Sequence, residues 1–406
     1  MKLLIVIPAL NEEQSIESII LRTQQAKYFI CKNSKVTFVD IVVVSDGSID
    51  NTAKITKSHS DKTDLIVFEK NRGYGAAIKE GWKSKNDADL LAFIDADGTC
   101  DPLFFKELCN MITEQGADIA LGSRLNKQSE MPLVRRIGNT VFSVLLSLVA
   151  NKRIKDTASG MRVIRKSALH KIMPLPDGLH FTPAMSARAI LSDDLTILEK
   201  DMPYLEREGE SKLKIWKDGK RFLSVILENI FLYIPYKIFN LFAFCFLSIA
   251  ILMIASPFLF YIKNHFLEEW MFYRFIVSAL FSLIAIVLLS ISHITYNVVS
   301  FTLRPNSKQK KTILYYFFEH QTSLFIAIFC YTAGTLLVFN SIWERLTTGL
   351  TQEHWSRYIS MVVLYLLGTI VLLSFFTNKI LMLIKGRMAY LQSLNEKPYK
   401  NSNEIQ

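Results

Sequence analysis

The sequence predicts an α/β domain with a mostly parallel sheet, followed by an interfacial amphipathic helix and an α-helical membrane domain. Three observations support this prediction. Apolar runs of strand length alternate with helix-like segments through the first half of the chain. Four apolar runs, each long enough to span a bilayer, follow in the second half. Lysine and arginine are concentrated in one set of the loops between these runs.

Composition separates the two halves. The chain has 406 residues, of which 50% are apolar, and a formal net charge of +10. We interpret the charge as a bias toward membrane surfaces. Nucleic acid is not an expected partner, because the sequence has no basic stripe with interleaved aromatic residues. The five cysteines are scattered without metal-ligand spacing, which is typical of free thiols in a reducing compartment.

The first half predicts five strands in order. The first, 3–7, is continuously apolar, as central parallel strands are. The others are expected at 40–44, 65–68, 90–94 and 118–121. Helices are expected from Asn11, with Gln14 in a capping-box-like start, and over 50–59, 71–82 and 104–113.

Polar residues follow four of these strands and should meet at one edge of the sheet. The segments are 8–13, 46–48, 71–75 and 95–97. Asp46 can accept a hydrogen bond from a ring N–H of a nucleotide base, and Gly73 lets backbone approach a ligand closely. Asp95 and Asp97, spaced i and i+2 on an extended chain, can point together and hold Mg²⁺ or Mn²⁺. The sequence therefore predicts a nucleotide site.

These four segments resemble family-2 glycosyltransferases of the GT-A type, which have a Rossmann-like, mostly parallel sheet. Within that superfamily the chain is similar to polyprenyl-phosphate sugar transferases of the dolichyl-phosphate mannose and glucose synthase type. Four further segments carry this similarity: Gly122-Ser123-Arg124, Arg135-Arg136-Ile137-Gly138-Asn139, 156–162 and 204–213.

The resemblance implies a role for each matching residue. The expected donor-binding residues are Pro8, Ala9, Asn11, Glu12, Asp46, Gly73, Asp95 and Lys212. Arg124, Arg135 and Asn139 are expected to hold the acceptor phosphate. Asp97, Asp156 and Arg207 are expected catalytic residues, with Asp156 in the sugar pocket, and Asp95 and Asp97 are the expected metal ligands. Two alternatives stay open: Arg135 or Arg136 as the phosphate ligand, and Asp95 as a metal ligand or a ribose contact, with Asp97 favoured as the direct ligand.

The charge of such a site fits its chemistry. A lipid phosphate is largely ionised near neutral pH, so it needs little help from a general base but must approach another anion. Arginines and a metal on the leaving diphosphate answer that repulsion. One departure concerns the segment 177–185, where related transferases often carry a glutamate. Here Thr182-Pro183-Ala184 offers no carboxylate, and His180 is more typical of a packed or exposed histidine than of a sugar ligand.

The second half predicts a membrane domain. Residues 214–236 form an amphipathic interfacial helix, with Lys217, Lys220 and Arg221 near its start. Four spans are expected at 239–261, 272–294, 323–343 and 359–384. His293 is expected to be structural, and we expect no carboxylate or charge pair inside the membrane.

Basic residues predict the topology. Arg304 and Lys308 lie between the second and third spans, and Lys385 follows the fourth. This places the transferase half and the C-terminus in the cytoplasm of a multi-pass protein of the inner cell membrane. The expected domains are 1–213, a cytosolic glycosyltransferase; 214–236, the interfacial helix; 237–386, the four-helix domain; and 387–406, a cytosolic tail.

The leading hypothesis is an inverting, metal-dependent enzyme that moves one sugar from a UDP- or GDP-sugar to a polyprenyl phosphate in cell-envelope glycan synthesis. One alternative is a processive polysaccharide synthase, disfavoured because the sequence lacks the further acidic motif and the Gln-x-x-Arg-Trp motif of those enzymes. Another is a non-catalytic helper of lipid-linked sugar translocation, disfavoured because Asp46, Asp95 and Asp97 are all present. The expected partners are the nucleotide sugar, the lipid phosphate and the membrane. A homo-oligomer is compatible with the sequence, which leaves the sugar identity and the oligomeric state open.

Overall fold

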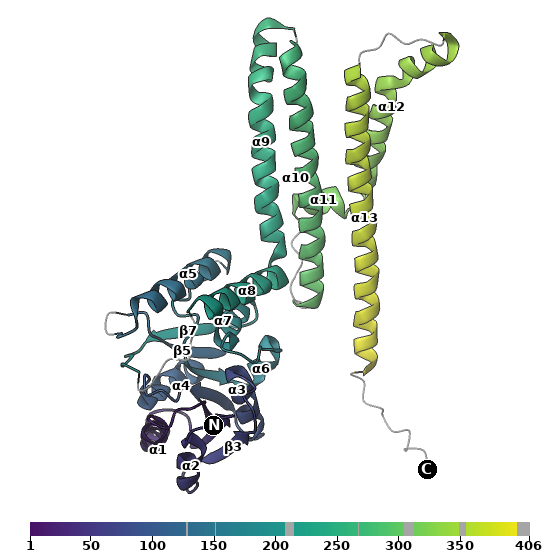
Figure 1. Cartoon of the computed structure of the whole chain (residues 1–406). Helices are drawn as coiled ribbons and strands as arrows, with labels where there is room; N and C mark the ends of the chain where they lie inside the picture. The colour runs from purple at the N-terminus through teal and green to yellow at the C-terminus, as the bar shows by residue number, and fades with distance from the viewer. Residues whose placement is uncertain are drawn as a thin grey trace, which may run out of the picture. The chain divides into compact units, whose positions relative to one another are not determined.

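The computed structural model describes residues 1–126, 129–150, 152–207, 215–266, 268–303, 312–348 and 355–395 (Figure 1). Lys212 and the basic residues Arg304 and Lys308 lie outside these ranges. The chain forms two compact units, Met1–Tyr233 and Ile234–Gln406.

The first unit is built on a seven-stranded sheet of order β3-β2-β1-β4-β6-β5-β7. Its strands are β1 (Lys2–Ala9), β2 (Phe38–Asp46), β3 (Asp64–Phe68), β4 (Leu90–Ile94), β5 (Ile119–Ser123), β6 (Met161–Arg165) and β7 (Ile197–Asp201). All neighbouring pairs are parallel except those of β6, which runs antiparallel to β4 and to β5. The predicted mostly parallel sheet is confirmed, and β1 lies inside it, as its apolar run indicated.

Helices cover both faces of this sheet, because successive side chains of each strand point to opposite faces. The helices are α1 (Ile16–Asn33), α2 (Thr52–Ser58), α3 (Tyr74–Lys83), the 3-10 turn η1 (Pro102–Phe104), α4 (Phe105–Thr113), α5 (Leu133–Ala150), α6 (Lys166–Ile172), α7 (Phe181–Leu191) and α8 (Ile215–Tyr233). From β1, Leu3, Ile5 and Ile7 pack with α1 and α4. Leu4 and Val6 pack with α3, α6 and α7 on the other face.

The start of α1 differs from the prediction. The helix begins at Ile16, after Ser15, and Asn11 does not cap it. Asn11 instead has a positive φ of 51°, and its Oδ1 accepts a hydrogen bond from the N–H of Ile49 at 2.8 Å. The side chain therefore ties the end of β1 to the loop after β2, an interaction that local sequence cannot reveal.

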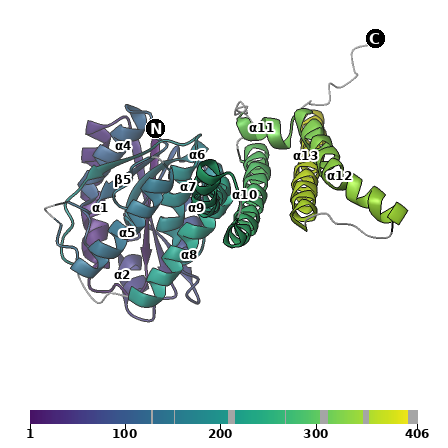
Figure 2. The same cartoon turned by 90° about the horizontal axis from the view of Figure 1, so that it is seen from above.

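Helices α5 and α8 lie beside each other in the first unit (Figures 1 and 2). Both expose apolar side chains: on α5, Leu133 and Leu148 are each 72% exposed, and on α8 Trp216 is 85% and Phe231 is 51% exposed. Contiguous exposed apolar surface marks a site of interaction with a protein or a membrane.

The second unit is helical. It contains α9 (Pro235–Asn264), α10 (Glu269–Thr302), α11 (Ile313–Phe318), α12 (Thr322–Thr348) and α13 (Trp355–Asn395). Helices α9 and α10 pair, as do α12 and α13, and α10 also packs against α13 (Figure 2). The four predicted spans fall within α9, α10, α12 and α13. Within the described residues, α5 is a fifth helix that is long and apolar enough to cross a membrane.

A buried polar network joins α10, α11 and α13 in the second unit. The Nε2 atom of His293 lies 2.9 Å from Oε2 of Glu319, and Asn297 Nδ2 donates to the same oxygen at 2.8 Å. Asn297 Nδ2 also lies 2.9 Å from Asn378 Oδ1. A Glu319 carboxylate only accepts hydrogen bonds, so this contact suits a His293 whose Nε2 carries a proton. Glu319 lies between the second and third predicted spans and is 26 residues from His293 in sequence, so local sequence does not reveal this pairing.

Helices α12 and α13 share a repeated pattern, Tyr-x-x-Gly-Thr, at 331–335 and 365–369. Tyr331 lies 2.9 Å from Thr369 Oγ1, and Tyr365 lies 2.8 Å from Thr335 Oγ1. Each threonine hydroxyl donates to a backbone carbonyl of its own helix, so each tyrosine is the donor between helices. Gly334 makes room for the Tyr365 ring, because a Cβ on Gly334 would lie 2.8 Å from that ring. A Cβ on Gly368 would first meet Cys330 at 3.2 Å and Ala327 at 3.3 Å.

Candidate active site

A cavity of about 940 Å³ opens in the first unit at the carboxyl ends of β1, β2 and β4. This is the edge at which α/β sheets bind ligands. Among the predicted donor residues, those on the cavity wall are Pro8, Ala9, Glu12, Asp46, Gly73 and Asp95. Asn11 is close by in sequence but has the structural role described above, and Lys212 lies outside the described residues.

Asp46, at the end of β2, fixes the loop that begins α3. Its Oδ1 accepts from the N–H of Arg72 at 2.6 Å and its Oδ2 from the N–H of Gly73 at 2.9 Å. Gly73 has a φ of +106°, and a Cβ there would lie 2.4 Å from the carbonyl oxygen of Asp177. Only glycine fits this position, so the close backbone approach that the sequence indicated occurs, here against the chain's own segment before α7.

Asp95 and Asp97 follow β4, and both reach the cavity wall, as their spacing predicted. Tyr74 donates its hydroxyl to Asp95 Oδ1 at 2.6 Å, and the backbone N–H of Asp95 donates to the carbonyl of Gly160. Burial of the carboxyl, together with the neighbouring charge of Asp97, raises the pKa of Asp95 to about 7. Asp97 Oδ1 accepts from the Thr99 hydroxyl at 2.6 Å, so the two carboxylates have different surroundings.

Arg207 bridges two acidic side chains of this site. Its Nη2 lies 2.6 Å from Glu12 Oε1 and its Nη1 lies 3.1 Å from Asp97 Oδ2. The guanidinium thus neutralises charge at the position where the two aspartates could hold a cation. Two wall carboxylates match the way Mg²⁺ binds when substrate phosphates supply other ligands. In the described parts of the chain, no three His, Cys, Asp or Glu side chains are grouped as a metal site.

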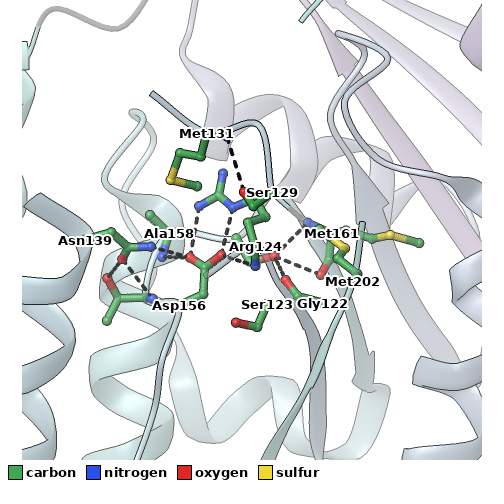
Figure 3. Close-up of polar contacts among 12 residues, drawn as sticks. Gly122, Ser123, Arg124, Ser129, Met131, Asn139, Asp156, Ala158, Met161 and Met202 are labelled. Atoms are coloured by element: carbon green, nitrogen blue, oxygen red, sulfur yellow. Dashed lines mark hydrogen bonds and ion pairs between the residues drawn. The ribbon is translucent and has the colours of Figure 1, made fainter. Parts of the chain in front are cut away.

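Arg124, Asp156 and Asn139 form one buried network (Figure 3). Asp156 accepts from Arg124 Nε at 2.8 Å and Nη2 at 2.9 Å, and from Asn139 Nδ2 at 2.7 Å. Asn139 Oδ1 accepts from the hydroxyl and the N–H of Thr157. Burial alone would raise the pKa of Asp156, but the Arg124 guanidinium and these donors hold it below its ordinary value.

This network shows what the predicted site residues contact. Asp156 is fully buried, is absent from the cavity wall and contacts Arg124, so its place in the sugar pocket stays a prediction. The amide of Asn139 is engaged by Asp156 and Thr157, although the residue lines the cavity. Asp156 and Asn139 therefore position Arg124. Arg124 lines the cavity and keeps Nη1 outside this ion pair.

The cavity wall formed by α5, α8 and the segment before α5 is basic and apolar. Arg135, Lys220 and Arg221 line it, whereas Arg136 donates to the backbone carbonyl of Asn126 and is absent from the wall. Apolar side chains of α5, α8 and the segment before α5 surround these bases: Met131, Val134, Ile137, Phe142, Trp216, Phe222 and Leu223. Sequence analysis assigned Lys220 and Arg221 to a membrane-facing helix. Their place on the cavity depends on how α8 packs against α5 and α7, which the basic cluster alone does not indicate.

Comparison with known proteins identifies the family. The model of glycosyl transferase family 2 matches residues 4–173. The UDP-N-acetylglucosamine–dolichyl-phosphate N-acetylglucosaminyltransferase of Methanococcus voltae is 30% identical over 185 residues, which cover 41% of this chain and 70% of that protein. The chain belongs to glycosyl transferase family 2. This membership confirms the recognition made from the strand-end motifs and the predicted GT-A type of the sheet.

Two further relatives and one solved structure are also similar to this chain. The low-salt glycan biosynthesis hexosyltransferase Agl6 of Haloferax volcanii is 31% identical over 229 residues, and the chain spans about half of its length, 53%. The dolichyl-phosphate hexose transferase of the same organism is 29% identical over 56% of this chain and 95% of that protein. Glucosyl-3-phosphoglycerate synthase of Mycobacterium tuberculosis, solved with Mn²⁺ and UDP, is 18% identical with a TM-score of 0.44, over 56% of this chain and 79% of that one.

Proposed function

We propose that this chain transfers one sugar from a UDP- or GDP-sugar to a membrane polyprenyl phosphate, with inversion at the anomeric carbon and with Mg²⁺ or Mn²⁺. One observation carries the proposal: a single cavity has an acidic wall and a basic, apolar wall. Carboxylates of Glu12, Asp46, Asp95 and Asp97 lie where the strands end. Bases set among apolar side chains lie on α5 and α8.

The basic and apolar wall of the cavity suits a ligand that has both an anionic and an apolar part. Arg135, Lys220 and Arg221 can bind a phosphate, and arginine binds phosphate oxygens in pairs. The Nη1 atom of Arg124, which lies outside the ion pair with Asp156, can contact the same phosphate. The apolar side chains around these bases can contact the first units of a polyprenyl chain. The Methanococcus voltae N-acetylglucosaminyltransferase and the Haloferax volcanii hexose transferase, both named for dolichyl phosphate, support this acceptor class.

The acidic wall of the cavity suits a metal ion and the diphosphate of the donor. Asp97 would ligate the cation directly, with Asp95 beside it. When bound, the metal would offset the charge of the leaving diphosphate. Arg207 already contacts Asp97, so a diphosphate at this position comes within its reach. Asp46 and the Gly73 loop would hold the nucleoside part of the donor.

The reaction follows from these two binding regions, one for the acceptor phosphate and one for the donor diphosphate. The acceptor phosphate is already an anion, so no side chain needs to remove a proton from it. One of its oxygens forms a bond to the anomeric carbon on the face opposite the diphosphate. The bond between that carbon and the diphosphate oxygen breaks, and the electron pair leaves with the nucleoside diphosphate. The basic residues hold two anions in the orientation that this displacement needs.

We also propose the cytoplasmic leaflet as the site of reaction, with residues 1–213 as the catalytic part. The exposed apolar side chains of α8 and α5 would lie in the membrane–water interface. Helices α9, α10, α12 and α13 would span the membrane, residues 237–386, with the tail 387–406 on the catalytic side.

Reconstituted protein tests the proposal. The full chain in nanodiscs is incubated with a panel of radiolabelled UDP- and GDP-sugars, a polyprenyl phosphate, and either Mg²⁺, Mn²⁺ or EDTA. We expect label in a lipid that releases its sugar in mild acid, only with metal, and none with Asp97→Ala. Label in a long polymer would show a processive synthase. Full transfer by Asp97→Ala would overturn the assignment of the carboxylates.

A further inference from the structure

Thr182 occupies a fixed position in the cavity wall. It is the second residue of α7, is 4% exposed and lines the cavity. The preceding residue, Phe181, is fully buried and packs its ring against those of Tyr74, Trp82 and Phe93. Because Phe181 is held in this aromatic cluster, the first turn of α7 cannot move away from the cavity without disturbing the core.

The first turn of α7 leaves hydrogen-bonding groups of Thr182 unused. The N–H of Phe181 donates to the carbonyl of Gly178, and the N–H of Ala184 donates to that of His180. Pro183 has no N–H. Within the described residues, neither the N–H nor the hydroxyl of Thr182 has a hydrogen-bond partner. The hydroxyl oxygen of Thr182 is not fully buried, so an unpaired N–H and an unpaired hydroxyl on the cavity wall are both available to a ligand.

The position of Thr182 indicates which part of the ligand it meets. The segment before α7 is clamped to the start of α3, since Ala76 donates its N–H to the carbonyl of Asp177. Tyr74, in the same turn of α3, packs against Phe181 and binds Asp95. Thr182 is therefore on the side of the cavity where Tyr74 and Asp95 lie.

Small residues line the cavity beside Asp95 and Thr182, namely Gly73, Ala158, Gly160 and Gly178. The cavity of about 940 Å³ has room for a ring-sized group, although a Cβ on Gly73, Gly160 or Gly178 would meet Asp177, Asp95 or His180. The nearby charges are of both signs, because Asp95 is acidic and Arg221 Nη1 would lie 3.7 Å from a Cβ on Gly178, so a neutral group fits this position.

We propose that Thr182 binds the transferred sugar, through its hydroxyl and N–H, at one oxygen substituent of a neutral hexose or N-acetylhexosamine. This inference rests on the proposed glycosyl transfer. A hydroxyl oxygen and an acetamido carbonyl oxygen present the same acceptor to these two donors. Thr182 thus sets sugar specificity at a wall position where the chain carries no acidic side chain.

Binding measurements on matched variants test the role proposed for Thr182. Thr182→Val keeps the shape and the N–H but removes the hydroxyl, and Thr182→Ser keeps both groups. Calorimetry with Mg²⁺ measures the affinity of the full chain for UDP, GDP, UDP-glucose, UDP-N-acetylglucosamine and GDP-mannose. We expect Thr182→Val to weaken the binding of the preferred nucleotide sugar about tenfold, the loss of one buried hydrogen bond. Binding of the free nucleotide should change less than about twofold, and Thr182→Ser should resemble the parent.

Two further comparisons locate the contact. Thr56→Val serves as the control, because Thr56 is buried in α2 and uses its hydroxyl on the carbonyl of Thr52. It should leave sugar selectivity unchanged. Deoxy analogues of the preferred donor identify the oxygen: the Thr182→Val penalty should vanish for the analogue, or the non-acetylated sugar, that lacks it.

The inference fails if Thr182→Val binds free nucleotide and nucleotide sugar with the same loss, since that is a structural effect. It also fails if Thr182→Val binds the preferred donor like the parent. These binding results do not need transfer to a lipid. Absence of transfer by the parent with every donor would reject the proposed function, while the difference between nucleotide and nucleotide sugar would still decide the role of Thr182.

Discussion

At the scale of single residues, the ion pair of Asp156 with Arg124 has the largest expected energy. The side chain of Asp156 is 0% exposed and that of Arg124 is 11% exposed. Removing one member of a buried pair leaves the other charge without compensation. We expect Asp156→Asn to lower the free energy of unfolding by about 3–5 kcal/mol, measured by denaturant titration in detergent.

The matched control for this change is Asp201→Asn. Asp201 pairs with Lys155, but both side chains are about half exposed, at 49% and 56%. Exposed pairs contribute less than about 1 kcal/mol. Equal losses in the two variants would contradict the role given to Asp156.

Gly160 makes the position of Asp95 possible. A Cβ on Gly160 would lie 1.7 Å from Asp95 Oδ2, so alanine must displace that carboxylate. We expect Gly160→Ala to reduce sugar transfer by about 100-fold, because displacement of a reacting-site group by about 1 Å has such effects. Gly386→Ala is the control, since no atom lies within 4 Å of a Cβ there. Parental activity of Gly160→Ala would show that Asp95 tolerates movement.

The raised pKa of Asp95 predicts a pH effect on stability. With a pKa of about 7, the folded chain keeps a proton that the unfolded chain releases near pH 4. The folded state therefore binds more protons between about pH 4 and 7, and this contribution to stability falls as the pH rises through that window. We expect Asp95→Asn, which stays neutral, to gain melting temperature relative to the parent from pH 5 to pH 8 in EDTA. A difference independent of pH would argue against the shift.

At the scale of elements, the sequence predicted the first five strands and missed the last two. Strands β1 to β5 were anticipated from their apolar runs. β6, which inserts antiparallel between β4 and β5, and β7, which pairs with β5, were not. The segment 156–162 before and into β6 had been assigned only as a motif. The pairing of Asp156 with Arg124 joins residues 32 apart in sequence, so local sequence does not reveal it, and the resemblance to known transferases placed Asp156 in the sugar pocket.

The network around Glu319 holds α11 to α10. Glu319 is 6% exposed and His293 is 4% exposed, so Glu319→Leu would leave the donors of His293 and Asn297 without an acceptor. We expect a loss of about 1–2 kcal/mol, the range for hydrogen bonds between membrane helices. Unfolding by SDS titration measures it. Glu319→Gln keeps an acceptor and should stay close to the parent; an equal loss in both would mean that charge, not hydrogen bonding, matters.

At the scale of the whole molecule, the proposed membrane contact of α5 and α8 can be tested away from the cavity. Leu148 and Phe231 are exposed and do not line it. We expect Leu148→Glu with Phe231→Glu to lower transfer to polyprenyl phosphate in bilayers at least tenfold, because charge at the interface opposes insertion. UDP-sugar binding should not change. Ile49→Glu, at a site 92% exposed on the same unit, is the control. An equal effect of Ile49→Glu would reject this surface.

The reciprocal pattern on α12 and α13 has a consequence for register. Each helix supplies one tyrosine donor and one threonine acceptor, so the two hydrogen bonds are reciprocal. A slide of either helix by one turn, about 5.4 Å, would break both hydrogen bonds together and bring the Tyr365 ring against a side chain in place of Gly334. Only one alignment of the two helices therefore satisfies both hydrogen bonds, and a slide that breaks one of them does not restore the other.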